Sequence, residues 1–144
     1  MKQRRWSAFS LIELTVALGI AAFCLLAVMG LIPIAVQTNR NATSQTVAIN
    51  IVASVIADMR ATTAATSPQY GITFGTAKTL YFDSAGQFTI SLGANSRYRA
   101  RVTFPTSPTG LSYADIRVTW PAAVDPTTTT PSGSVEMFAA FDRN

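Results

Sequence analysis

A long apolar run near the N-terminus most constrains what this chain can fold into. From Leu14 to Asn39 the sequence carries no charged residue. A helix rises about 1.5 Å per residue, so residues 14–36 span roughly 35 Å, enough to cross a hydrocarbon core of about 30 Å. The run exceeds the about 7–15 apolar residues of a cleaved secretory signal, and Phe23 before Cys24 does not fit a lipoprotein signal. We therefore expect a retained membrane helix.

Basic residues before this run set the expected orientation. Lys2, Arg4 and Arg5 supply three of the eleven basic residues. By the positive-inside rule, the N-terminus lies in the cytoplasm and the rest of the chain on the other side of the membrane. Without residues 1–8 the charge is eight basic minus seven acidic residues, or +1. The high pI therefore reflects largely the N-terminus and argues against a nucleic-acid-binding domain.

The composition excludes several kinds of chemistry. The sequence contains no histidine and one cysteine, Cys24. Catalytic triads that need histidine, zinc sites that use it, and an intrachain disulfide are therefore excluded. No phosphate-binding loop and no recognisable carboxylate pair is present, and the acidic residues are too scattered for a calcium site. We expect no enzyme activity, no metal and no cofactor.

Glu13 places a charge near the start of the apolar run. A carboxylate at the centre of a membrane helix costs about 2.5–3.5 kcal/mol on insertion scales, and less near the interface. Two interpretations follow. The carboxylate makes a functional contact, as intramembrane charges usually do, or it reaches the interface and has no further role. Position alone does not decide between them.

The residues around Glu13 follow a known pattern. The sequence AFSLIE at residues 8–13, which begins at the last residue of the basic leader MKQRRWSA, resembles the processing and N-methylation motif of type IV prepilins and type II secretion pseudopilins. That motif joins a basic leader, a small residue, a phenylalanine, a glutamate at the fifth mature position and a long apolar helix. The family usually has glycine where this chain has Ala8.

The resemblance implies a processing and assembly route. A prepilin peptidase would cleave between Ala8 and Phe9, and the Phe9 amine would then be methylated. In a filament, Glu13 would pair with the Phe9 amine of a neighbouring subunit, so that neither charge is buried alone and the axial register is fixed. The implied partners are the peptidase/N-methyltransferase, other pilin or pseudopilin subunits and an inner-membrane assembly platform.

One long helix is expected over residues 9–62. Its first part, 9–36, is the membrane-spanning assembly segment, and 37–62 is an amphipathic second half. Pro33, which follows Gly30, removes a backbone hydrogen bond and predicts a kink or local unwinding. The apolar positions of the second half recur at spacings of three and four residues. They are Ala48, Ile51, Val52, Val55, Ile56 and Met59.

The remainder of the chain, 63–144, alternates apolar and polar residues with the period of β-strands. Strands are expected at 79–83, 87–92, 97–104, 115–120 and 135–141, with the first two forming a hairpin. Alternation that leaves one face of the strands polar and solvent-exposed favours an antiparallel sheet that covers the helix. The expected fold is α+β and pilin-like, with the long helix packed on this C-terminal sheet. The end of the chain also resembles PilV-like minor pseudopilins and the Verru_Chthon cassette protein B group.

Three arginines line one face of an expected strand. Arg97, Arg99 and Arg101 could contact an anion, a nucleic acid or a partner protein. They could also form an ordinary solvated face that pairs with Asp115 or Glu136. Because no aromatic platform is interleaved with them, the sequence favours the solvated face.

The sequence therefore favours a structural, minor prepilin-like subunit of a type II secretion pseudopilus or type IV pilus. Its sheet domain is expected in the periplasm, anchored to the bacterial inner membrane by one helix. The alternative is a single-pass anchored binding domain whose arginines bind DNA or another anionic ligand.

Overall fold

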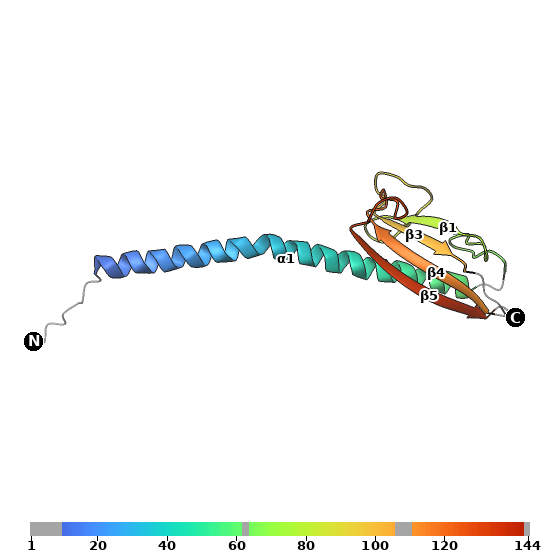
Figure 1. Ribbon diagram of the computed structural model, residues 1–144, viewed down its shortest axis with the longest axis horizontal. Coiled ribbons are helices and arrows are strands. Elements are labelled where there is room, and N and C mark those ends of the chain that lie inside the picture. The colour runs from blue at the N-terminus through green and yellow to red at the C-terminus, as the bar shows by residue number, and fades with distance from the viewer. Residues whose placement is uncertain (1–9, 62–63, 106–110, 143–144) are drawn as a thin grey trace, which may run out of the picture. The chain divides into compact units, whose positions relative to one another are not determined.

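The computed structural model describes residues 10–61, 64–105 and 111–142, without the side chains of Leu111 and Asp142. Within these residues the chain forms one helix, α1 (Leu11–Arg60), followed by five strands (Figure 1). This arrangement confirms the expected α+β class. The chain divides into two compact units, Met1–Arg40 and Asn41–Asn144.

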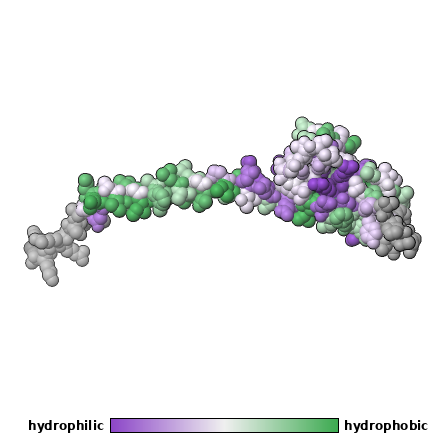
Figure 2. All heavy atoms as spheres, in the orientation of Figure 1, coloured by the Kyte–Doolittle hydropathy of each residue, from purple (hydrophilic) through white to green (hydrophobic). Residues whose placement is uncertain are grey.

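The first unit contains the apolar part of α1. Every described residue from Ser10 to Arg40 is exposed, and Figure 2 shows a largely hydrophobic surface along this stretch. By length and composition, α1 is able to cross a membrane. The helix is continuous across Gly30 and Pro33, and the kink expected there stays a prediction.

In the second unit, α1 buries one face. The expected apolar positions are buried, and so are two polar side chains, Ser44 and Asp58. Their spacing of three and four residues places them on one side of the helix. The helix ends at Arg60, two residues before the expected position, and a basic residue in the last turn interacts favourably with the helix dipole.

The strands form one antiparallel sheet in the order β2-β1-β3-β4-β5. Every expected strand position contains a strand, although β4 and β5 begin earlier than expected and β2 is much shorter. β2 ends early because the Ser96 side chain bonds to the backbone of Gly93 and Ser91, which closes a local turn. The strands are β1 (Lys78–Phe82), β2 (Phe88–Thr89), β3 (Tyr98–Thr103), β4 (Leu111–Trp120) and β5 (Gly133–Asp142).

The core lies between the sheet and the buried face of α1. In β3, Tyr98, Ala100 and Val102 are buried, whereas the residues between them lie on the other face. They join the buried helix residues in one hydrophobic cluster. At the start of β5, Gly133 is paired with Trp120, whose indole occupies the space that a Cβ at position 133 would need. The burial of alternate residues in β3 confirms the period-two alternation that the sequence indicates.

Candidate functional site

The start of α1 is closed by a pair of reciprocal hydrogen bonds. The backbone N–H of Glu13 donates to Ser10 Oγ at 3.2 Å, and the backbone N–H of Ser10 donates to Glu13 Oε2 at 3.3 Å. This is a capping box, in which two otherwise unpaired helix donors are satisfied by side chains. The Ser-x-x-Glu spacing is the sequence signature of this box, and the prepilin-like processing motif does not account for it.

The capping box gives Glu13 a local role. Its Oε2 serves the helix end, whereas its Oε1 has no hydrogen bond to any described residue. Among the described residues, one carboxylate oxygen is thus open to a second donor. The proposed cleavage residues Ala8 and Phe9, and the leader residues Lys2, Arg4 and Arg5, lie outside the described residues.

The three arginines of the candidate anion-binding face do not converge on one site. Arg97 donates from Nη2 to Ser44 Oγ on α1 at 3.3 Å, so its side chain reaches toward the helix. Arg99 is 12% exposed and pairs with Asp125 at 3.0 Å. Its guanidinium also lies 5.7 Å from the centre of the Tyr81 ring. Two of these cations are thus engaged within the domain.

Arg101 is exposed and lies opposite a second cation, Arg117, across β3 and β4. The expected cross-strand partners of the arginines are different in the structure. Asp115 lies opposite Thr103, and Glu136 lies opposite Arg117. Asp125 could not be identified as a partner from strand alternation, because it belongs to the loop between β4 and β5.

Two carboxyl groups on this side of the sheet have shifted pKa values. Burial raises the pKa of Asp115, the nearby charge of Glu136 raises it further, and Arg117 acts in the opposite direction. The pKa of Asp125 is lowered by hydrogen bonds from the Thr127 hydroxyl and backbone N–H, with a smaller effect of Arg99. The face is thus a mixed network of both charges.

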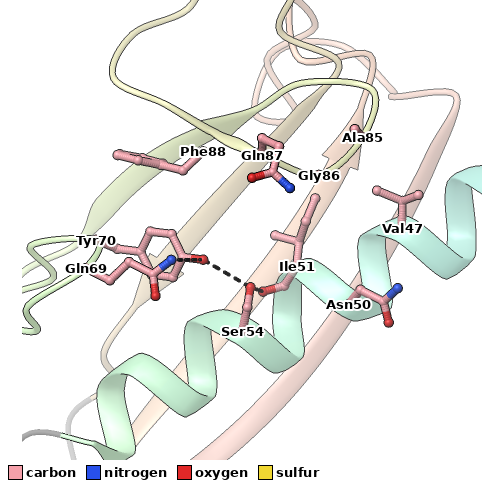
Figure 3. Close-up of a pocket in the computed structure, with 10 residues that line it drawn as sticks. All are labelled: Val47, Asn50, Ile51, Ser54, Gln69, Tyr70, Ala85, Gly86, Gln87 and Phe88. Atoms are coloured by element: carbon pink, nitrogen blue, oxygen red, sulfur yellow. Dashed lines mark hydrogen bonds between the residues drawn. The ribbon is translucent and has the colours of Figure 1, made fainter.

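A pocket of about 430 Å³ lies between α1 and the β1–β2 hairpin (Figure 3), and we call it the hairpin pocket. On one wall, Gln69 Nε2 donates to the Tyr70 hydroxyl at 3.2 Å, and that hydroxyl donates to Ser54 Oγ at 3.2 Å. The lining residues are Val47, Asn50, Ile51, Ser54, Gln69, Tyr70, Ala85, Gly86, Gln87 and Phe88.

Two features hold the hairpin pocket in shape. Asp58 is buried, and its two oxygens accept the backbone N–H groups of Gln69 and Tyr70 at 3.0 Å each. On the opposite wall, Gly86 has a φ of 80°, and a Cβ there would lie 3.2 Å from Val47 Cγ1 on the helix. Glycine therefore allows the hairpin turn to approach α1 closely. Strand periodicity did not predict this pocket.

A second hollow, of about 560 Å³, lies between α1 and β5. It is lined mainly by alanines and larger apolar side chains, with Arg60 at the helix. No group of three or more potential metal-binding side chains occurs within the described residues.

Comparison with known proteins adds no family to this geometry, since no protein-family model, no curated protein and no solved structure matches the chain.

Proposed function

We propose that this chain is a prepilin-like structural subunit, of the minor type, of a type II secretion pseudopilus or type IV pilus. The observation that carries the proposal is the AFSLIE motif placed directly at the start of a long, exposed apolar helix. An antiparallel sheet that covers the second half of the same helix is the architecture that the resemblance implies.

In the proposed mechanism, the membrane stores the chain before assembly. The basic leader keeps the N-terminus in the cytoplasm, and the sheet domain lies in the periplasm. The peptidase cuts between Ala8 and Phe9 and leaves a new amine on Phe9, which is then methylated. Because the cut precedes the apolar run, the helix stays in the membrane until an assembly ATPase outside this chain drives its insertion into the filament.

Glu13 is proposed to fix the register between subunits. Its partner is the Phe9 amine of a neighbouring subunit. In an ideal helix, the four-residue step from position 9 to position 13 spans about 6 Å along the axis. The capping box is compatible with this role, because it uses Oε2 and leaves Oε1 for the amine. The pair would lie in a low-dielectric environment. Removing the Glu13 charge would therefore leave the Phe9 amine buried without a partner and would disfavour assembly.

The contacts of the arginines argue against the alternative function. A single-pass anchored domain that binds DNA through Arg97, Arg99 and Arg101 needs three available cations. Arg97 is exposed but bonds to Ser44, and Arg99 is 12% exposed and pairs with the half-exposed Asp125. Of the three arginines, such a domain would retain Arg97 and Arg101 as exposed contacts.

Two substitutions test the proposed role of Glu13. Glu13→Leu removes both the charge and the capping box, and we expect it to insert and be processed but to stay out of filaments. Glu13→Gln is the sharper variant, because glutamine also serves in a capping box but carries no charge. Both chains are followed by processing in membranes and by their amount in sheared filaments.

If the charge fixes the register, Glu13→Gln is processed normally and excluded from filaments. Normal incorporation of Glu13→Gln would assign Glu13 to helix capping alone and would contradict the proposed contact. Ser10→Ala is the matched control, because it breaks one capping bond and leaves the carboxylate. We expect it to assemble.

A further inference from the structure

The hairpin pocket has a chemistry that helix assembly does not use. Its ten lining residues carry no formal charge. They include three carboxamides, a serine and a tyrosine hydroxyl, together with the ring of Phe88, which is 38% exposed. The wall is therefore polar but neutral, with one accessible aromatic surface.

We propose that the hairpin pocket binds a neutral, hydroxyl-rich ligand of the size of one or two sugar rings. A carboxamide offers both donors and acceptors, as a hydroxyl group does, so the two kinds of group can pair in either direction. The absence of charge in the lining gives an ionic ligand no counter-charge to offset its desolvation. The volume of about 430 Å³ lies within the range of small-ligand sites.

The polar groups are distributed around the space as such a ligand requires. Figure 3 shows the Gln87 carboxamide pointing from the hairpin toward α1. Gln87 makes no side-chain hydrogen bond with the described residues, so its donors and acceptor are open to a ligand. Across the pocket, the Gln69–Tyr70–Ser54 chain presents fixed hydroxyl and amide groups.

An aromatic wall complements these groups. The rings of Phe88 and Tyr70 meet edge to face, with centroids 5.4 Å apart and an interplanar angle of 74°. This contact holds the partly exposed Phe88 ring in place. One side of a sugar ring presents C–H groups and the edge presents hydroxyls, which matches an aromatic surface beside carboxamides.

The pocket is also preorganised. Asp58 fixes the backbone at Gln69 and Tyr70, and Gly86 allows the hairpin to lie close to the helix. A site whose polar groups are already held loses less entropy when a ligand binds.

Saturation-transfer NMR on the full chain in phosphocholine micelles tests the proposal. Glycoside detergents are avoided because their head groups would compete for the pocket. The probes are glucose, N-acetylglucosamine and its disaccharide, titrated through the millimolar range. We expect saturable transfer to at least one probe, and competition between probes.

Matched variants assign that binding to the hairpin pocket. Gln87→Glu adds a charge and removes two donors within the pocket, whereas Gln45→Glu makes the same change at an exposed helix position. Tyr70→Phe removes the pocket hydroxyl, and Tyr113→Phe is its control on β4. We expect the pocket variants to weaken binding about tenfold, equivalent to about 1.4 kcal/mol, and the controls to leave it unchanged.

Three results would overturn the proposal. They are no saturable transfer to any sugar, equal losses in pocket and control variants, or saturation of the pocket by a neutral peptide but by no sugar. Binding is measured without the peptidase or a filament, so failure here leaves the proposed assembly function untouched.

Discussion

Asp58 is the buried charge on which the loop after α1 depends. Asp58 is 6% exposed, and its two carboxylate oxygens accept the backbone N–H groups of Gln69 and Tyr70 at 3.0 Å each. Asp58→Ala removes both acceptors. The Tyr70 side of the loop is closed to solvent, since Tyr70 is 5% exposed, whereas Gln69 is exposed.

The expected cost follows from these two environments. A hydrogen bond to a charged group contributes about 1.5–3 kcal/mol, and a buried donor left without a partner costs about 1–3 kcal/mol. Water can replace the acceptor at Gln69 but not at Tyr70. We therefore expect Asp58→Ala to lower the free energy of unfolding by about 3 kcal/mol.

Chemical denaturation of the full chain in micelles, followed by near-ultraviolet circular dichroism of the aromatic core, measures this loss. Asp83→Ala is the matched control. Asp83 also accepts two backbone N–H groups, from Ala85 at 2.9 Å and Gln87 at 2.8 Å, but in an exposed turn where water can take its place. We expect the control to lose less than about 1 kcal/mol. Equal losses in the two variants would mean that burial of the Tyr70 N–H does not set the cost of removing its acceptor.

Three further predictions concern the sheet. Gly133→Ala places a methyl group against the Trp120 indole, and we expect the free energy of unfolding to fall by about 1–3 kcal/mol in the same denaturation assay; no loss would mean that the ring moves freely. A raised pKa means that folded Asp115 binds its proton more tightly than the unfolded chain, so its contribution to stability falls as the pH rises above 3.8. Asp115→Asn should therefore raise the midpoint of thermal unfolding at pH 7 and remove this part of the pH dependence, and a lower midpoint would contradict the sign. Arg99→Lys should lower the thermal midpoint more than Arg101→Lys, because Arg99 pairs with Asp125 and lies over an aromatic ring while Arg101 is exposed; equal shifts would contradict this difference.

Periodicity predicted the elements of this fold well. The three- and four-residue spacing from Ala48 to Met59 identified the buried face of α1, because a helix that covers a sheet needs one apolar stripe. Alternation in β3 identified which residues face the core. The short β2 was not predicted, because the Ser96 turn depends on side-chain bonds that hydrophobic patterning does not register.

Polar contacts were less predictable than burial. Asp58 lies on the buried side of α1, but its partners lie eleven and twelve residues further along, beyond the reach of local patterns. Arg97 belongs by alternation to the face of Arg99, yet it precedes β3 and turns toward Ser44. The Ser-x-x-Glu spacing of Ser10 and Glu13 does predict the capping box, and with it a local role for Glu13.

The N-terminus of the mature chain distinguishes a processed prepilin-like subunit from a plain anchored domain. The chain is produced in cells with an active prepilin peptidase and in matched cells without it, and the intact mass is measured after extraction from the membrane. We expect a chain that begins at a methylated Phe9 in the first cells and at Met1 in the second. An intact Met1 terminus in both would rule out processing between Ala8 and Phe9 and favour a plain anchored domain.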